Sequence, residues 1–368
     1  MSSERIRRFL AGQAPPTPFL VVDTALVTAR VREFAAEFPH SRLCYAVKAN
    51  PEPAVLRAVL AAGGGFDVAG PAEITACLAE GAAPESLSYG NPIKKAADIA
   101  FAFEHGVREF TTDAESDLRQ IARHAPGSAV SVRMLVETPA SATPFGRKFG
   151  CTPAEAVALL RLATDLGLTP GLAFHVGSQQ PDPSAWDTGI ATAAKVAAEA
   201  GIPLAHLNIG GGFGIRYRDP VPSLAEYAAV VRAALAAHFP TPPRLVLEPG
   251  RAVVAEAGLI RTEVVLVAWR GEHRWVYLDI GRYNGLAETE NEAIPYRFED
   301  GGGERGPVIL AGPTCDGDDV LYQHTPCELP LALAPGDQLG ILDAGAYTAS
   351  YSSVAFNGIE PLRTYCLE

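Results

Sequence analysis

Residues 44–50, with the sequence CYAVKAN, form the stretch from which the rest of the chain is best interpreted. The apolar run is interrupted at Asn50-Pro51, so we predict a strand that ends there and carries Lys48 near its carboxyl end. A lysine in that position can be partly desolvated, which lowers the pKa of its amine and makes the amine a nucleophile. The stretch alone fits a surface lysine equally well, so the choice depends on the rest of the chain.

Predicted strands and helices alternate on both sides of this stretch. Short strands begin at 19–22 and end at 244–247, and they are separated by helices at about 25–38, 53–63, 71–81, 95–105, 114–124, 153–166, 183–200 and 223–238. About eight strand–helix units in about 230 residues predict an α/β fold, a TIM-like parallel (β/α)8 barrel. We place this barrel at residues 20–252.

A second domain follows the barrel. After Pro249-Gly250 the sequence becomes rich in β-segments with a period of two, at 253–267, 274–280, 308–311, 338–343 and 362–366. We predict a mostly antiparallel β-domain built from residues 253–368 together with 1–19. A chain of 368 residues exceeds the usual size of a single hydrophobic core, which also favours two domains.

The composition argues against several classes of function. Hydrophobic residues make up 48% of a chain with a net charge of −12, which predicts a folded protein that does not bind nucleic acid or an anionic membrane. No stretch approaches the roughly 18 apolar residues of a membrane span, and the first residues lack the apolar region of a secretory signal. The six cysteines are scattered without a CxxC pair, so we expect reduced thiols in the cytoplasm and no metal site.

In a barrel of this kind the functional residues lie at the carboxyl ends of the strands. In this chain such positions hold Lys48, Asp67, Arg133, His175, Ser178, Gly210, Gly211, Gly212, Glu248 and Arg251. The glycine run lets backbone N–H groups approach an anion, so it is either a phosphate cradle or an ordinary loop. Glu248 and Arg251 form either a structural ion pair or a pair in which the arginine binds a cofactor phosphate.

The histidine and the hydroxyl at 175–178 leave more than one interpretation open. His175 is either structural or stacked on an aromatic ring. The chain has no HExxH motif, which disfavours metal catalysis, and Ser178 lacks a GxSxG elbow, which disfavours a hydrolase triad.

The β-domain contains an acidic segment, GPTCDGDD at 312–319. Nearby negative charge raises the pKa of a thiol, so Cys315 suits a proton donor better than a nucleophile. Acidic residues at the edge of a site indicate a cationic substrate group, although a solvated acidic turn explains them too. The segments GAYT (345–348) and FNG (356–358) contain aromatic residues that belong either to the core or to a ligand site.

Together the motifs resemble the ornithine/lysine decarboxylases among the pyridoxal phosphate enzymes of the alanine-racemase fold (fold type III), and bacterial ornithine decarboxylases in particular. The motifs are YAVKAN (45–50), FDVA (66–69), FHVGSQ (174–179), IGGGFG (209–214), EPGR (248–251), GPTCDG (312–317), GAYT (345–348) and FNG (356–358). They cover nearly the whole chain in order. The resemblance implies a homodimer with active sites at the subunit interface, where Cys315 and Asp316 reach into the partner's site.

The resemblance also implies a role for each residue. Lys48 would hold pyridoxal 5'-phosphate as a Schiff base, His175 would stack on its ring, and Glu248 would keep a proton on the ring nitrogen. The phosphate would be bound by Ser178, Gly210, Gly211, Gly212, Arg251 and Tyr347, and the site near Lys48 would be oriented by Asp67 and Arg133. Cys315 would protonate the substrate carbon after CO2 leaves. The substrate-binding residues would be Asp316, Glu292, Tyr283 and Phe356.

The same residues favour one reaction and leave the substrate partly open. A carboxylate at the ring nitrogen favours decarboxylation, whereas racemases of this fold place an arginine there. Asp316, with Asp318 and Asp319 beside it, suits a distal ammonium better than the distal carboxylate of diaminopimelate. We therefore expect decarboxylation of L-ornithine to putrescine, with L-lysine to cadaverine as an open second activity, because one methylene is worth only about 1–3 kcal/mol.

Two alternatives stay open. One is a decarboxylase of another amine-tipped substrate, such as carboxynorspermidine or a pathway-specific amino acid. The other is a catalytically inactive homologue that binds a partner protein, as antizyme inhibitors do. Two departures from the family pattern bear on the substrate, namely Gly70 in place of the usual serine and the extra charge of Asp318.

Overall fold

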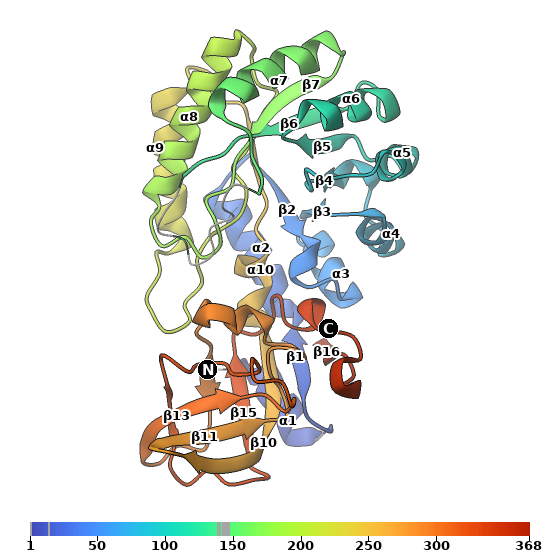
Figure 1. Cartoon of the computed structure of the whole chain (residues 1–368). Helices are drawn as coiled ribbons and strands as arrows, with labels where there is room; N and C mark the ends of the chain where they lie inside the picture. The colour runs from blue at the N-terminus through green and yellow to red at the C-terminus, as the bar shows by residue number, and fades with distance from the viewer. Residues whose placement is uncertain (1, 14, 138–140, 142–147) are drawn as a thin grey trace. The chain divides into compact units, whose positions relative to one another are not determined.

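The computed structural model describes residues 2–13, 15–137, 141 and 148–368 (Figure 1). The chain divides into two compact units, which we describe separately. The barrel unit comprises Thr28–Gly214 and Val221–Ala252, and the sheet unit comprises Met1–Val27, Ile215–Pro220 and Val253–Glu368.

The barrel unit is built on a closed ring of parallel strands in chain order, β2 to β9, which confirms the predicted barrel. The ring closes where β2 pairs with β9, Arg42 opposite Val246. The strands are β2 (Arg42–Ala46), β3 (Gly65–Val68), β4 (Leu87–Tyr89), β5 (Glu109–Thr112), β6 (Ala129–Arg133), β7 (Thr169–Ala173), β8 (His206–Asn208) and β9 (Arg244–Leu247).

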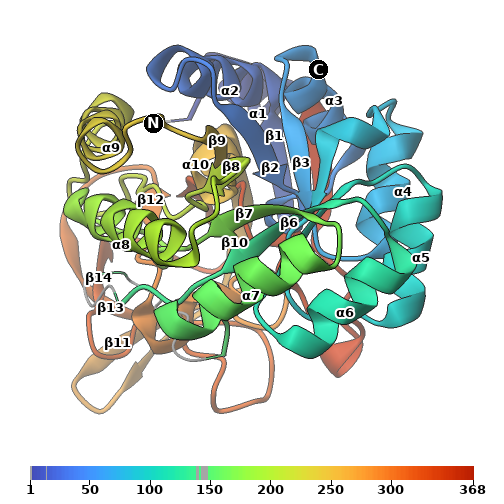
Figure 2. The ribbon, with the colours of Figure 1, turned by 90° about the horizontal axis from the view of Figure 1, so that it is seen from above.

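Helices lie around the outside of these strands, as the view from above shows (Figure 2). They are α2 (Thr24–Glu37), α3 (Pro53–Ala61), α4 (Pro71–Ala79), α5 (Ala96–Glu104), α6 (Glu115–His124), α7 (Pro153–Asp165), α8 (Ser184–Ala200) and α9 (Leu224–His238), and the short α10 (Arg251–Val254) follows the end of β9. Two helix starts are fixed by capping boxes, Thr152 with Glu155 for α7 and Ser223 with Glu226 for α9. In the described residues no helix has the length and apolar character needed to cross a membrane.

Charged and polar side chains occupy the amino end of the barrel. The Glu109 carboxylate accepts ion pairs from Arg42, at 2.5 Å, and from Arg244, at 2.8 Å. His206 lies 2.6 Å from the Ser131 hydroxyl, and Gly171 leaves room for its ring, since a Cβ there would lie 2.4 Å from it. These residues act structurally, so the chemistry is left to the opposite, carboxyl end of the strands.

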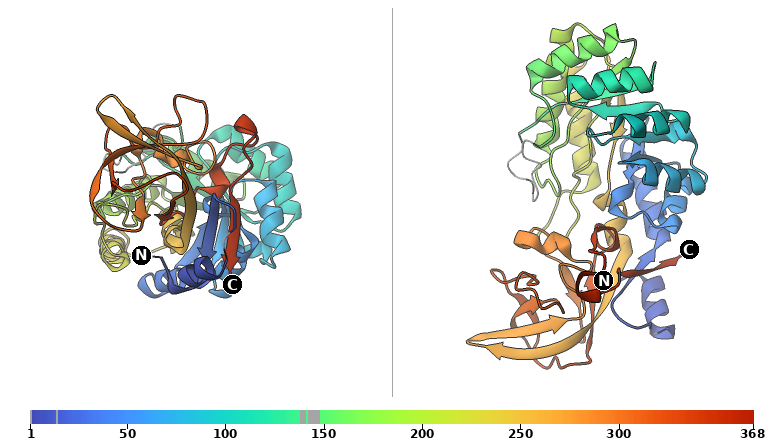
Figure 3. Two further views of the ribbon diagram at one scale, coloured as in Figure 1. Left: turned by 90° about the horizontal axis from the view of Figure 1, so that it is seen from below. Right: turned by 45° about the vertical axis from the view of Figure 1, so that its right-hand side comes forward.

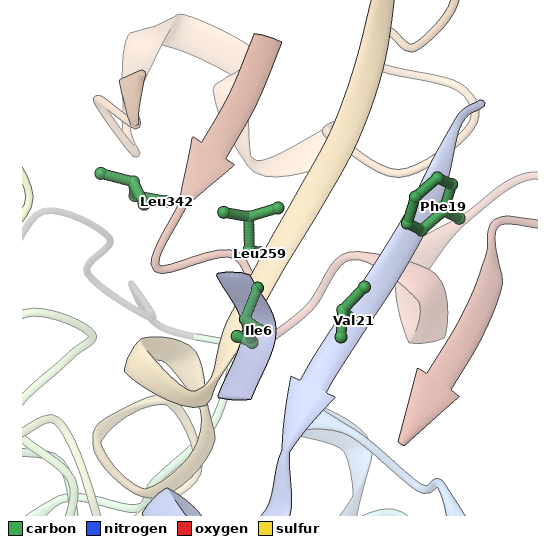
Figure 4. Packing of buried hydrophobic residues seen from close by; sticks show 5 residues of the cluster. All are labelled: Ile6, Phe19, Val21, Leu259 and Leu342. Carbon is green, nitrogen blue, oxygen red and sulfur yellow. The ribbon is translucent and has the colours of Figure 1, made fainter. Parts of the chain in front are cut away.

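The sheet unit contains an eight-stranded sheet in which most pairs are antiparallel (Figure 3). Its main path runs β12 (Arg297–Glu299), β15 (Gln338–Leu342), β10 (Gly258–Arg270), β11 (His273–Leu278), β13 (Arg305–Ala311) and β14 (Cys327–Pro330). The remaining strands are β1 (Phe19–Asp23), which pairs with β10, and β16 (Arg363–Leu367), which lies parallel to β1. Helix α1 (Glu4–Gly12) packs Ile6 into a cluster whose other members are Phe19, Val21, Leu259 and Leu342 (Figure 4).

The structure differs from the expected domain boundary at residue 20. Strand β1 pairs Leu20 with Ile260 of β10 and with Thr364 of β16, so the sheet unit extends to Val27. A strand followed by helix α2 looks locally like one more barrel unit, and only its pairing partners show that it belongs to the other sheet.

Candidate active site

Lys48 lies one turn beyond the strand on which we expected it. Strand β2 ends at Ala46, and residues Val47–Ala49 form a 3-10 turn closed by the N–H of Asn50, which donates to the Val47 carbonyl at 3.1 Å. Val47 and Ala49 are buried, whereas the Lys48 side chain is exposed at the carboxyl end of the barrel. The turn therefore places the Lys48 side chain at the carboxyl end of the barrel, where its charge acts on Asp67 and Glu248.

Two carboxylates approach each other beside this turn. Asp67 belongs to β3, and Glu248 directly follows β9. Gly90 lies against both, because a Cβ there would be 2.0 Å from Asp67 Oδ1 and 3.4 Å from Glu248 Oε1. Burial raises the pKa of Asp67, and burial together with the charge of Asp67 raises the pKa of Glu248 to about 8.

Cations balance this pair. Burial lowers the pKa of Arg133, at the end of β6, while Glu248, Asp113 and Asp67 act in the opposite direction. The charges of Arg133 and Lys48 both favour the ionised forms of Asp67 and Glu248. The structure therefore brings these predicted site residues together around one centre of alternating charge.

The ring of His175 is held in its neutral form. Its Nδ1 accepts a hydrogen bond from the Gly177 N–H at 3.0 Å, so the neutral ring carries its proton on Nε2. Burial, with the positive charges of Arg133 and Lys48, places the pKa of His175 well below its usual value. A neutral, flat ring held in this manner is suited to stacking on an aromatic cofactor.

The glycine run after β8 is required by close backbone packing. A Cβ on Gly210 would lie 2.7 Å from the Phe174 carbonyl oxygen, one on Gly211 would lie 2.4 Å from that of Glu248, and one on Gly212 would lie 2.3 Å from that of Gly177. Gly210 and Gly212 also have positive φ values of 67° and 94°. A side chain at any of the three positions would push neighbouring strand ends apart.

The phosphate-binding residues predicted in the barrel unit lie near one another. The Arg251 guanidinium, in a residue only 5% exposed, donates to the Ser178 hydroxyl at 3.5 Å. A buried arginine, a hydroxyl and a side-chain-free loop form a suitable donor set for a phosphate group. These residues of the barrel unit, which we call the cofactor seat, therefore fit the phosphate of the cofactor that the resemblance implies.

Sequence reasoning missed Asn208, the last residue of β8. Its amide Nδ2 donates to Glu248 Oε1 at 2.5 Å, and its Oδ1 accepts from the Gly210 N–H at 2.9 Å. Its position at a strand end, next to the glycine run, was the available signal. It was missed because the segment was interpreted only through its glycines.

The remaining predicted residues belong to the sheet unit, where four side chains form a cluster. The rings of Tyr283 and Phe356 stack with centroids 4.3 Å apart, and the Tyr283 hydroxyl hydrogen-bonds to the carboxylate of Asp316. The thiol of Cys315 is exposed and lies 3.5 Å from Asn357 Nδ2. We call Cys315, Asp316, Tyr283 and Phe356 the acidic-tip cluster. The other residue, Tyr347, is half-buried and has a positive φ of 54°.

Two further carboxylates near this cluster, those of Asp319 and Glu292, accept hydrogen bonds from backbone N–H groups. Asp319 is 2% exposed, and its carboxylate accepts hydrogen bonds from the Arg282 N–H, the Thr314 N–H and the Thr314 hydroxyl, at 2.8, 3.1 and 2.7 Å. It therefore joins two loops and does not face a substrate cation. The Glu292 carboxylate accepts from the backbone N–H groups of residues 324 and 325 at 2.6 and 3.3 Å, so it anchors that loop.

Within the described part of the chain, no three His, Cys, Asp or Glu side chains gather in a way that would hold a metal ion. All six cysteines are free thiols.

Comparisons with known proteins match both units. Residues 24–255 match the family model for the pyridoxal binding domain of pyridoxal-dependent decarboxylases. The lysine/ornithine decarboxylase of Selenomonas ruminantium is 33% identical over 97% of this chain and 91% of its own length, and the chloroplastic ornithine decarboxylase of Nicotiana glutinosa is 34% identical over 93% and 82%. The crystal structure of the Vibrio vulnificus lysine/ornithine decarboxylase complexed with putrescine has a TM-score of 0.88 at 30% identity, covering 100% of this chain and 99% of that one.

Proposed function

Because the chain belongs to the family of pyridoxal-dependent decarboxylases, we propose that it removes the α-carboxyl group of L-ornithine to give putrescine, with L-lysine as a second substrate that gives cadaverine. Support comes from the Selenomonas relative, named a lysine/ornithine decarboxylase, and from the Vibrio enzyme, solved with putrescine and with cadaverine. The observation that carries the substrate proposal is the carboxylate of Asp316, held by Tyr283 in a cluster without a cationic partner for a distal carboxylate among its four residues.

The barrel residues would hold the cofactor. Lys48 would bind it covalently, and Ser178, Gly210, Gly211, Gly212 and Arg251, together with Tyr347 of the sheet unit, would bind its phosphate. Pyridoxal phosphate, when bound, takes up the electron pair that departing CO2 leaves on the substrate carbon. Glu248 would hold the proton of the ring nitrogen, the neutral ring of His175 would lie on the cofactor's face, and Asp67 and Arg133 would orient the groups around Lys48.

The acidic-tip cluster would handle the substrate. Cys315 would deliver a proton to the substrate carbon, and Asp316 would bind the distal ammonium, with Tyr283 and Phe356 beside it. Glu292 would be a second ligand of that ammonium, and its Oε1 accepts from the backbone N–H groups of residues 324 and 325.

We also propose that the active protein is a homodimer in the cytoplasm, in which the acidic-tip cluster of one subunit completes the site of the other. Phe356 of the cluster is 36% exposed, and two large side chains just before it in the sequence, Tyr351 and Val354, are 59% and 80% exposed. Exposed apolar side chains of this kind are expected on a surface that a second subunit covers. Mixing Lys48→Ala with Cys315→Ala protein tests this proposal. Recovery of activity in the mixture is expected, because hybrid dimers regain one intact site, and no recovery would contradict the shared site.

The activity itself is tested by product analysis. Purified protein with pyridoxal phosphate is offered L-ornithine, L-lysine, L-arginine and meso-diaminopimelate separately, and CO2 and amine are measured. Putrescine as the main product, with cadaverine second and no turnover by Lys48→Ala, is the expected result. No CO2 from any of the four, in protein that binds the cofactor, would overturn the substrate proposal and favour a specialised amine-tipped substrate. Protein that binds no cofactor would favour an inactive binding homologue.

A further inference from the structure

Asn208 has a buried side-chain amide in which both the NH2 group and the oxygen form hydrogen bonds. The residue is 2% exposed at the carboxyl end of β8, adjacent in the barrel to β9, from which Glu248 follows. The Gly210 N–H donates to Oδ1 at 2.9 Å and so fixes which end of the amide carries the NH2 group. That NH2 group donates to Glu248 Oε1 at 2.5 Å. The orientation of the amide is therefore set by the backbone of the glycine run.

Several charged groups face Glu248, so a hydrogen-bond donor affects both its ionisation and its orientation. Asp67 faces it from β3, Arg133 from β6 and Lys48 from the turn after β2. On β2 itself Arg42 adds a positive charge, and the buried thiol of Cys44 is uncharged because burial raises its pKa to about 12. Burial and Asp67 raise the pKa of Glu248 to about 8, and the Asn208 hydrogen bond acts against them more strongly than either cation does. Without that donor the carboxyl group is free to bind a proton or to turn toward Lys48 or Arg133.

We infer that Asn208 is a positioning residue which favours the ionised form of the Glu248 carboxyl group and aims it at the cofactor's ring nitrogen. The inference rests on the proposed role of Glu248. An ionised carboxylate accepts the hydrogen bond of a protonated ring nitrogen, whereas a protonated carboxyl group does not stabilise that charge. The proposed role of Asn208 is exerted through Glu248, and Asn208 touches no reacting atom.

A double-mutant cycle on cofactor affinity tests the inference. The dissociation constant of pyridoxal phosphate is measured by equilibrium dialysis, at one common pH, for wild type, Asn208→Leu, Glu248→Gln and the double variant. A hydrogen bond to a charged group corresponds to about 10- to 100-fold in an equilibrium constant, so we expect Asn208→Leu to weaken binding at least about 10-fold in the wild-type background. With Glu248→Gln already present, the same change should alter the constant less than about 2-fold. Equal factors in both backgrounds would mean a merely structural role and overturn the inference.

The cofactor-free protein supplies a readout that does not depend on the proposed function. The pH profile of thermal unfolding is recorded for the apoprotein, where loss of the donor should move the Glu248 contribution about one pH unit or more upward. An unmoved profile would overturn the inference even if cofactor binding changes. If the profile moves in a protein that binds no cofactor, the effect of Asn208 on the Glu248 carboxyl group is supported and the proposed function is rejected.

Thr262→Val is the matched control. The Thr262 hydroxyl also donates to a carboxylate at 2.5 Å, that of Asp279 in the sheet unit. This variant should lower the unfolding temperature without changing cofactor affinity or the Glu248 profile. If Asn208→Leu does not fold, Asn208→Ala, which removes the donor without adding bulk, replaces it in the same cycle, with the same outcomes.

Discussion

Replacing Asp319 by asparagine should loosen the two loops that present the acidic-tip cluster. The Asp319 carboxylate ties the N–H of Arg282, next to Tyr283, to the N–H and hydroxyl of Thr314, next to Cys315. It lies in a cradle formed by two glycines, since a Cβ on Gly281 or Gly312 would come within 2.1 or 2.3 Å of its oxygens. An asparagine has the same shape and fits this space.

The size of the effect follows from the three donors. In its best orientation the asparagine keeps the Arg282 hydrogen bond on Oδ1 and turns its NH2 group toward Thr314. The Thr314 hydroxyl can rotate to accept, but the N–H of the half-buried Thr314 loses its acceptor. One lost hydrogen bond to a charged group with one unsatisfied donor costs about 2 kcal/mol. For a unit of about 150 residues that corresponds to a fall of roughly 4–8 °C in unfolding temperature.

Calorimetry of Asp319→Asn and Asp318→Asn, side by side, measures this difference. Asp318 is the adjacent residue with the same chemistry, but it is exposed, so its substitution should change stability by less than about 0.5 kcal/mol. The KM for L-ornithine should rise in Asp319→Asn, with the affinity for pyridoxal phosphate unchanged. Equal unfolding temperatures for the two variants would refute the reasoning that the buried carboxylate holds the loops together.

Three further predictions follow from the site and the barrel. Cys315→Ala should bind the cofactor normally but form amine more slowly or misdirect product formation, and an unchanged product profile would count against a proton-donor role. Asp316→Ala should raise the KM for diamino acids about 10-fold or more, because a charge-assisted contact is lost, while cofactor affinity stays constant; an unaltered KM removes it from the substrate site. Burial lowers the pKa of His206 to about 4, from about 6.5 in the unfolded chain, so stability should fall by about 3 kcal/mol as pH decreases from 6.5 to 4. In His206→Gln this loss should shrink in a pH series of denaturation midpoints, and an identical slope would contradict the assignment.

The barrel was predictable because its signals are local and repeated. Each strand–helix unit carries its own apolar pattern, and the repetition corrects for errors in single elements. The carboxyl-end rule then placed Lys48, Asp67, Arg133, His175 and Glu248 on one end before any coordinates. The structure brings these residues into electrostatic contact, as expected of that rule.

Features that depend on long-range pairing were not predictable in this way. The pattern of residues 44–50 continues as a strand to Asn50, but the Ala46 N–H bonds to the Pro249 carbonyl, and the chain then turns at Lys48. Likewise β1 has the local pattern of a barrel strand, and only its register with Ile260 assigns it to the sheet unit.

Three acidic residues in one loop show most clearly what the sequence alone does not predict. Asp316, Asp318 and Asp319 are indistinguishable in composition, and all three fitted an acidic edge of a substrate site. Two glycines, at 281 and 312, leave the space that buries Asp319 and commits its carboxylate to backbone donors. A residue's role here depends on which distant residues lack a side chain.

Under the proposed function, the barrel unit would hold the cofactor and the sheet unit would determine the substrate. Around the cofactor seat, glycines in contact with neighbouring strand ends leave no space for variation, because any Cβ at 210–212 would meet a backbone oxygen within 2.7 Å. In the sheet unit, by contrast, Cys315 is exposed on a loop that the buried carboxylate of Asp319 ties to Arg282. Substitutions on the exposed side of that loop can alter the fit to ornithine or lysine without disturbing the seat. We therefore expect changes of substrate preference to map to residues around the acidic-tip cluster, and loss of cofactor to map to the barrel.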